Sequence, residues 1–195
     1  VELRAQLKAE VPAASRLTMT DLLTRACAIA LTRHPEVNAS WSGDQIERKS
    51  AVNIGIAVPP MEGMGLLVPV VKDCDRKDLI QLSIETRQII ERARSGRPGD
   101  GDLSGGSFSI SNLGMYGIEE FSAIINPPES AILAVGQIKA APIVEEGQIK
   151  IAQLMRMTLS ADHRILYGAP AAQFLGEIKK LLEKPAILAL PPAMV

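Results

Sequence analysis

The chain has 195 residues and a formal net charge of −1, with 47% hydrophobic and 22% charged residues. This length and composition are those of one ordered globular domain, residues 1–195, whose core needs no disulfide or metal. The near-neutral charge excludes a uniform attraction to nucleic acid or anionic lipid, and no stretch of about 18 apolar residues indicates a membrane-spanning helix. We therefore expect neither nucleic acid nor a membrane among its partners.

The cysteines and histidines are too few for a disulfide framework or a zinc site of the usual ligand number, because the chain has two of each. Cys27 falls within an apolar helical pattern, and Cys74 is flanked by Asp73 and Asp75, whose negative charges oppose thiolate formation. We expect no metal, two unreactive thiols and a reducing compartment.

The N-terminal half alternates between helical and strand patterns. The chain starts inside a helical pattern, residues 1–11, as a fragment would. Thr18 with Asp21 three residues later is a capping signal for a helix that continues to Pro35. A further helix follows Asp78 and ends near Gly96. Between these helices, the pattern predicts strands at residues 52–58 and 66–71, separated by a loop with Pro59, Pro60, Gly63 and Gly65.

The C-terminal half begins with a loop rich in glycine and proline, residues 97–106, which we expect to be mobile. Strand patterns follow at residues 107–111, 131–135 and 149–159, with a turn at Glu146-Gly147, and a last helix spans about 169–182. Because helices and strands mix without strict alternation, the sequence predicts an α/β (α+β) two-layer sandwich with a mixed sheet.

One histidine stands where catalytic groups are often found. His163 lies between Asp162 and Arg164, after an apolar strand pattern and before the last helix. An imidazole can accept a proton at neutral pH and return it, as acyl transfer to a thiol requires. A histidine at a strand end is more often a structural residue, however, so its position alone assigns no function.

A second polar pair, Ser111 and Asn112, ends another predicted strand before a glycine-rich loop. Hydrogen-bond donors fixed at a strand end could stabilise the oxyanion of a tetrahedral intermediate. The simpler interpretation is that the two residues close a turn.

Four stretches together resemble the catalytic domains of dihydrolipoamide acyltransferases, the E2 components of 2-oxo acid dehydrogenase complexes. They are Val-Asn-Ile-Gly-Ile-Ala-Val (52–58), Ser-Phe-Ser-Ile-Ser-Asn-Leu-Gly (107–114), Ile-Ile-Asn-Pro-Pro-Glu-Ser-Ala-Ile-Leu-Ala-Val-Gly (124–136) and Asp-His-Arg-Ile-Leu-Tyr-Gly (162–168). Their order and spacing match as well, and the resemblance runs from about Leu17 to the end of the chain. The stretch 110–117 is closer to the pyruvate type than to the succinyl type, which favours acetyl as the acyl group and leaves branched-chain groups open.

The resemblance implies a fold similar to that of chloramphenicol acetyltransferase and a homotrimer with active sites between subunits. Trimers of this family often form hollow cores of 24 or 60 subunits, which bind the E1 and E3 components of the complex. The implied substrates are coenzyme A and a lipoyl group that is carried on a domain outside this chain. Lipoyl and peripheral-subunit-binding domains, and the N-terminal part of the catalytic domain, are expected to precede Val1. The compartment would be the cytoplasm in bacteria, or the mitochondrial matrix or plastid stroma in eukaryotes.

The resemblance also implies roles for particular residues. His163 matches the general base that takes the proton from the attacking thiol, and Ser111 matches the hydroxyl that donates to the oxyanion from the neighbouring subunit. Asn112 lies beside it as a supporting residue. The family usually has an aspartate four residues after the histidine, and this chain has Tyr167 there. Arg164 then needs another carboxylate, for which Asp162 is the candidate.

Three other functions remain open beside the acyltransferase. Tyr167 motivates a structural core subunit with weak catalysis, although the presence of both His163 and Ser111 argues against it. A small-molecule transferase of the chloramphenicol type would share the histidine, but the Asn-Pro-Pro-Glu-Ser-Ala stretch favours the E2 component. A serine hydrolase is disfavoured because no Gly-x-Ser-x-Gly elbow surrounds Ser107, Ser109 or Ser111.

Overall fold

The computed structural model describes residues 1–59 and 65–195, and its five-stranded sheet has the order β4-β3-β5-β6-β7. The helices are α1 (Glu2–Glu10), α2 (Met19–Arg33), α3 (Leu79–Arg94) and α4 (Gly168–Glu183), and the strands are β1 (Ala39–Ser42), β2 (Gln45–Arg48), β3 (Ile54–Ile56), β4 (Val70–Val71), β5 (Phe108–Asn112), β6 (Ala131–Glu145) and β7 (Gln148–Ala161). The central pairs β3–β5 and β5–β6 are parallel, whereas β3–β4 and β6–β7 are antiparallel. The predicted mixed sheet is thus confirmed.

The two sides of β5 differ because successive side chains of a strand point to opposite faces. Phe108 and Ile110 belong to the apolar core, which also includes α2, α3 and α4 residues, and the Phe108 ring packs edge-on against Phe174 of α4 at 5.5 Å. Ser109 and Ser111 alternate with them and therefore face away from this core. Ser109 is nonetheless fully buried, so the second face of β5 is covered at this point but carries a polar side chain.

Both capping signals act as the sequence predicted. Thr18 and Asp21 form a reciprocal capping box at the start of α2, and Asp78 forms the same arrangement with Gln81 at α3. The Asp21 carboxylate also accepts a hydrogen bond from Ser83 of α3 at 3.0 Å. One carboxylate therefore starts α2 and fixes its position relative to α3.

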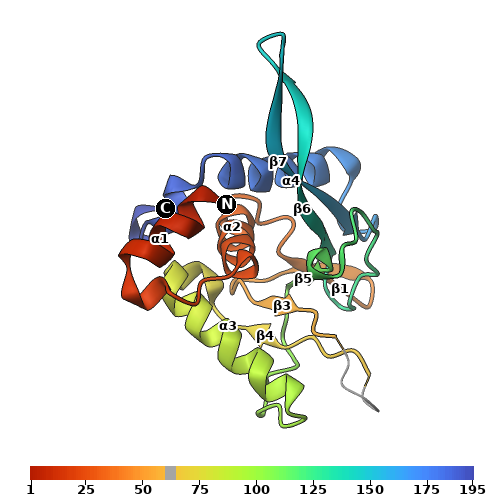
Figure 1. The fold of residues 1–195 in the computed structure, drawn as a ribbon. Helices are drawn as coiled ribbons and strands as arrows, with labels where there is room; N and C mark the ends of the chain where they lie inside the picture. The colour runs from red at the N-terminus through yellow and green to blue at the C-terminus, as the bar shows by residue number, and fades with distance from the viewer. Residues whose placement is uncertain (60–64) are drawn as a thin grey trace.

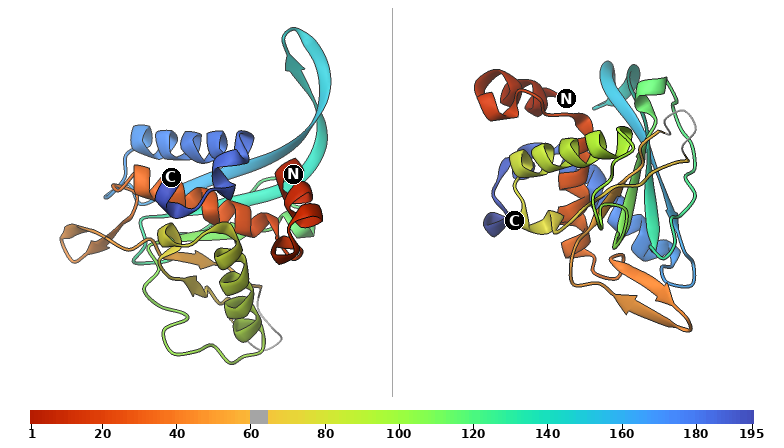
Figure 2. Two further views of the ribbon diagram at one scale, coloured as in Figure 1. Left: turned by 90° about the vertical axis from the view of Figure 1, so that its left-hand side faces the viewer. Right: turned by 90° about the horizontal axis from the view of Figure 1, so that it is seen from below.

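Strand β6 continues ten residues beyond the predicted strand at 131–135, whereas β7 is close to the predicted strand at 149–159. The two strands form an arm that projects from the body of the molecule (Figure 1). The predicted turn at Glu146-Gly147 is confirmed, since both residues have the positive φ values, 53° and 75°, of a tight hairpin turn. Two further views show the arm standing clear of the helices (Figure 2). Val144, Ile149 and Ile151 of the arm are 75–81% exposed, so burial within this chain does not stabilise the outer half.

Other strand boundaries also differ from the prediction. The segment 52–58 forms a strand only over β3, and 66–71 only over β4, joined by one isolated bridge between Val58 and Leu67. The predicted breaks at Pro60 and Gly63 lie outside the described residues. The short hairpin β1–β2, which turns at Gly43 with a φ of 65°, was not predicted, because four-residue strands give little periodicity.

Arg25 of α2 connects three parts of the fold, although it is only 1% exposed. Its guanidinium donates to the carbonyl oxygens of Lys77 and Leu190, each at 3.0 Å. Burial lowers the pKa of Arg25, and the nearby carboxylates of Asp78 and Asp75 oppose that effect. Arg25 thereby holds the C-terminal segment against α2 and the start of α3.

We expect Arg25→Ala to lower the free energy of unfolding by about 2 to 4 kcal/mol, because a buried side chain and its hydrogen bonds to two carbonyl groups are lost. Urea unfolding followed by circular dichroism measures this loss. Arg33→Ala is the matched control, since Arg33 pairs with Glu177 at the surface and should contribute about 0 to 1 kcal/mol. Equal losses in the two variants would contradict the structural role of Arg25.

Candidate functional site

The His163 turn, residues 162–167, connects β7 to α4 and is anchored by Ser130, the residue before β6. The Asp162 amide donates to the Ser130 carbonyl oxygen at 2.8 Å, and the amides of Ile165 and Leu166 both donate to the Asp162 carbonyl oxygen at 2.9 Å. Ile165 and Leu166 are buried, whereas His163 is exposed. The turn thus presents the imidazole outward from an anchored backbone.

Asp162 is the carboxylate that pairs with Arg164, as the sequence suggested. The guanidinium donates to both carboxylate oxygens: Nη2 lies 2.6 Å from Oδ2, and Nε lies 3.0 Å from Oδ1. This pairing lowers the pKa of Asp162. Arg164 also lies 4.9 Å above the ring of Trp41 on β1, so the unpredicted hairpin contributes to this surface.

Tyr167 occupies the position at which the family resemblance predicts an aspartate. It precedes α4 as the N-terminal cap residue of that helix. Its ring meets the His163 imidazole edge-on, with the ring centres 5.3 Å apart and an interplanar angle of 78°. An aromatic contact therefore adjoins His163 at this position, and Tyr167 remains 64% exposed.

Ser111 and Asn112 lie at the C-terminal end of β5, and they have different environments. Asn112 accepts a hydrogen bond from the Gly114 amide at 3.0 Å and donates to the Thr20 hydroxyl at 3.3 Å, so it closes the turn and fixes it to α2. Ser111 is half-buried and lines a cavity of about 210 Å³. Most of the other lining side chains are apolar, including Ile56, Val58, Ile90, Leu113 and Met115. Ser111, unlike Asn112, is thus open to a cavity with room for a small group.

A single chain does not bring His163 and Ser111 together. Ser111 pairs with Ala134 on β6, whereas the end of β7 at Ala161 pairs with Ala131, three residues earlier on the same strand. Strand spacings alone place Ala161 roughly 14 Å from Ser111, and His163 lies two residues beyond Ala161. The histidine and the serine are therefore carried by strands on either side of β6 and are separated within one chain.

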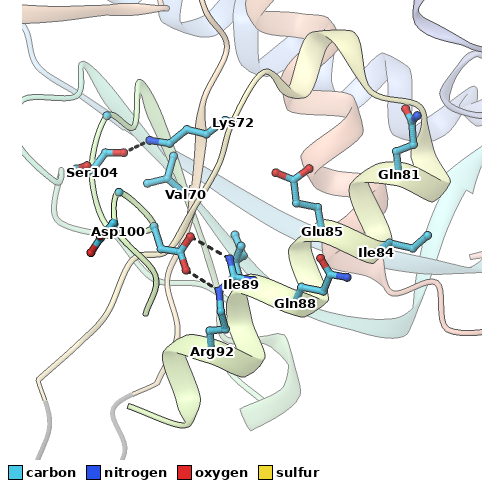
Figure 3. A pocket seen from close by; sticks show the side chains of 13 residues that line it. Val70, Lys72, Gln81, Ile84, Glu85, Gln88, Ile89, Arg92, Asp100 and Ser104 are labelled. Carbon is cyan, nitrogen blue, oxygen red and sulfur yellow. Dashed lines mark hydrogen bonds and ion pairs between the residues drawn. The ribbon is translucent and has the colours of Figure 1, made fainter. Parts of the chain in front are cut away.

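A cavity of about 650 Å³ contains neither group (Figure 3). It lies between α3 and the loop that precedes β5, and both of its basic side chains are already engaged. Arg92 binds Asp102 through two hydrogen bonds of 2.8 and 2.9 Å, and Lys72 donates to the Ser104 carbonyl. Asp102 also accepts from the Gly99 amide at 2.8 Å. The loop predicted to be mobile is therefore anchored at Asp102.

Both cysteines are buried, as the apolar helical pattern suggested for Cys27. For Cys74 the cause of the low acidity differs from the predicted one. Burial, rather than the neighbouring aspartates, is the largest effect and raises the pKa of Cys74 to about 12. Burial also raises the pKa of Cys27. Within residues 1–59 and 65–195, no three potential ligands gather in a metal-binding group. In the same part of the chain, no helix combines the length and hydrophobicity needed to cross a bilayer.

Comparison with known proteins assigns the fold and the motifs to a family. Residues 1–190 match the 2-oxoacid dehydrogenases acyltransferase (catalytic domain) family. The chain belongs to this family. Over 174 residues, or 89% of the chain, it is 43% identical to the dihydrolipoyllysine-residue acetyltransferase component of the pyruvate dehydrogenase complex of Rickettsia felis. This acyltransferase domain spans only 42% of that relative's length.

Solved structures agree with the family assignment. The cubic core of the pyruvate dehydrogenase multienzyme complex matches 97% of this acyltransferase domain and 78% of that chain, with a TM-score of 0.89 and 37% identity. Azotobacter vinelandii dihydrolipoamide acetyltransferase, studied for the role of a serine, a histidine and an asparagine in its mechanism, gives a TM-score of 0.89 at 36% identity, over 97% of this domain and 78% of that chain. Chloramphenicol acetyltransferase is similar in fold alone, with a TM-score of 0.58 and 16% identity, over 92% of this domain and 82% of that chain.

Two residues near the site were missed by the sequence analysis. Trp41 packs against Arg164, and Glu129 is a carboxyl group buried behind the His163 turn. The first could have been noticed as the single tryptophan of the chain. The second stands within the Asn-Pro-Pro-Glu-Ser-Ala stretch, whose resemblance drew attention to the family and not to the glutamate.

Proposed function

We propose that the chain is the catalytic domain of an acyltransferase that moves an acetyl group between the thiol of dihydrolipoamide and coenzyme A. One observation carries the assignment of its residues. Ser111 precedes His163 by 52 residues, the same separation as between the serine and the histidine studied in the Azotobacter vinelandii enzyme. The asparagine of that enzyme lies four residues after its histidine, where this chain has Tyr167.

His163 and Ser111 divide the chemistry of the transfer. The neutral imidazole of His163 takes the proton of the attacking thiol, and the resulting sulfur anion adds to the thioester carbonyl. The Ser111 hydroxyl donates a hydrogen bond to the oxyanion of the tetrahedral intermediate. When that intermediate collapses, the other thiolate leaves and recovers the proton from His163, so no acyl-enzyme forms.

The geometry supports an active site that is shared between subunits. The distance between Ser111 and His163 within one chain exceeds the reach of a hydrogen bond, while His163 is exposed and Ser111 opens to a cavity that fits a small acyl group. A homotrimer would place the His163 of one copy beside the Ser111 of the next. Further assembly into 24- or 60-subunit cores, and binding of lipoyl domains and the E1 and E3 components, belong to the same proposal.

The direct test is transfer of acetyl from acetyl coenzyme A to free dihydrolipoamide by the purified, assembled protein. Turnover with dihydrolipoamide but not with chloramphenicol as acceptor supports the proposal. If assembled trimers give no turnover with either acceptor, the chain is the structural core subunit that Tyr167 motivated. Comparison with branched-chain and succinyl thioesters defines the acyl group.

A further inference from the structure

Glu129 is a buried carboxyl group to which the acyl-transfer steps assign no role. It is 3% exposed and lies just before β6. Its carboxyl group packs over β3 and the start of β5, where two glycines leave room for it. A methyl group at Gly106 would lie 2.5 Å from Glu129 Oε1, and one at Gly55 would lie 3.7 Å from the same atom.

The surroundings of this carboxyl group favour a neutral side chain. Asn126 donates to Oε1 at 3.2 Å, and the Ser109 hydroxyl lies against the carboxyl group without the alignment of a regular hydrogen bond. No donor among the described residues reaches Oε2. An ionised carboxylate in this position would be a buried charge without a counterion.

No cation on the elements packed around Glu129 pairs with it. The nearby Lys72, which follows β4, instead donates to the Ser104 carbonyl. The other groups that the structure places around the side chain or at its backbone are uncharged: Ser40 on β1, Gly55 on β3, Val70 on β4, Gly106 and Ser109 on or before β5, and Asn126.

The position of Glu129 connects the two separated parts of the proposed site. Its side chain contacts Ser109, which lies two residues before Ser111 on the same face of β5. The next residue, Ser130, accepts the hydrogen bond from the Asp162 amide at 2.8 Å that anchors the His163 turn. Displacement of residues 129–130 would therefore move both the strand that carries Ser111 and the turn that carries His163.

We propose that Glu129 is a positioning residue for acyl transfer, and that its protonated form holds β5 and the His163 turn in their relative places. The proposal rests on the proposed function for its effect on catalysis. A protonated carboxyl group accepts from Asn126 through Oε1 and leaves no uncompensated charge buried beside Ser109.

The pH dependence follows from the environment. Burial raises the pKa of Glu129 above its ordinary value, and the polar contacts with Ser109 and Asn126 oppose that rise. Because the pKa in the folded state lies above that in the unfolded chain, folding is favoured at low pH. This contribution is lost as the pH rises from the unfolded pKa through the folded pKa.

The experiment compares the wild-type core with Glu129→Gln, Glu129→Ala and the exposed control Glu91→Gln. An amide keeps the shape and donor capacity of the protonated acid, so Glu129→Gln should keep kcat within about twofold, whereas Glu129→Ala should lower kcat by about tenfold or more with little change in KM. Difference infrared spectra at neutral pH should contain a protonated-carboxyl band that disappears only in the Glu129 variants. The melting temperature of Glu129→Gln should fall less with rising pH than that of the wild type.

Two results would overturn the proposal. One is a loss of kcat in Glu129→Gln as large as in Glu129→Ala, which would mean that the carboxylate charge is required. The other is the absence of the infrared band together with equal pH dependence of melting in the wild type and Glu129→Gln. The infrared and melting comparisons decide the protonation state even if the wild type lacks transferase activity, and also if Glu129→Ala does not assemble.

Discussion

His163→Ala is expected to lower the turnover number for acetyl transfer by about 10²- to 10⁴-fold, the usual contribution of a general base. Without the imidazole, the attacking thiol has to lose its proton to water before it can add to the thioester. Because His163 is exposed and lies on a turn whose backbone hydrogen bonds do not involve its ring, the variant should fold and assemble like the wild type. Steady-state kinetics on cores of confirmed size measure the effect.

The other histidine provides the matched control. His34 ends α2 and contacts Phe174 and Glu36, far from the candidate site in sequence and role. His34→Ala should therefore keep the turnover number of the wild type per assembled core. An unchanged rate in His163→Ala would remove His163 from the site, and an equal loss in both variants would point to a structural effect.

Ser111→Ala is expected to lower the turnover number by about 10²- to 10³-fold while KM changes little, because the hydroxyl binds the oxyanion and not the ground-state carbonyl. Ser111 is half-buried, and its side chain lines a cavity. The fold should thus tolerate the loss of one oxygen atom. Kinetic analysis with both substrates varied separates the two parameters.

Ser104→Ala serves as the control for this experiment, since Ser104 contributes its backbone carbonyl to Lys72 and lies at the large cavity away from the site. Its kinetics should be those of the wild type. An increase in KM alone for Ser111→Ala would contradict the oxyanion role and indicate a contact with the ground-state substrate.

The residues at which α2 and α3 begin could be predicted because the capping signals are local in the sequence. Thr18 with Asp21, and Asp78 ahead of an apolar helical stripe, form reciprocal hydrogen bonds within one helical turn, and a sequence shows such neighbours directly. The Glu146-Gly147 turn is equally local, because positive φ values at both residues favour few side chains.

The outer part of β6 could not be predicted in the same way, although the pattern at residues 149–159 predicted most of β7. Most of the β6 residues from 139 to 145 are exposed, and they show neither the alternation of a half-buried strand nor the continuous apolar run of a buried one. The pairing is continuous along the arm apart from one irregularity between Val135 and Ile138.

At the candidate site, the roles of the residues were assigned from the resemblance of the motifs to a family and not from the local position of each residue. Position alone favoured a structural role for both His163 and Ser111. Asn112 does act as a turn-closing residue, through its bonds to Gly114 and Thr20. The pairing of Asp162 with Arg164 could be inferred from the sequence because the two residues are only two positions apart. The stacking of Trp41 on Arg164 was not, because it joins segments separated by more than half of the chain.

The central claim is that one active site combines the His163 of one copy with the Ser111 of another, and mixing two inactive variants tests it most directly. His163→Ala and Ser111→Ala chains are co-assembled in equal amounts, and acetyl transfer is compared with that of each parent alone. Random assembly into rings of adjacent copies restores both groups in about one quarter of the sites, so the mixture should recover about one quarter of wild-type activity. Activity no higher than that of the two parents, in mixed assemblies verified by mass spectrometry, would contradict the shared site.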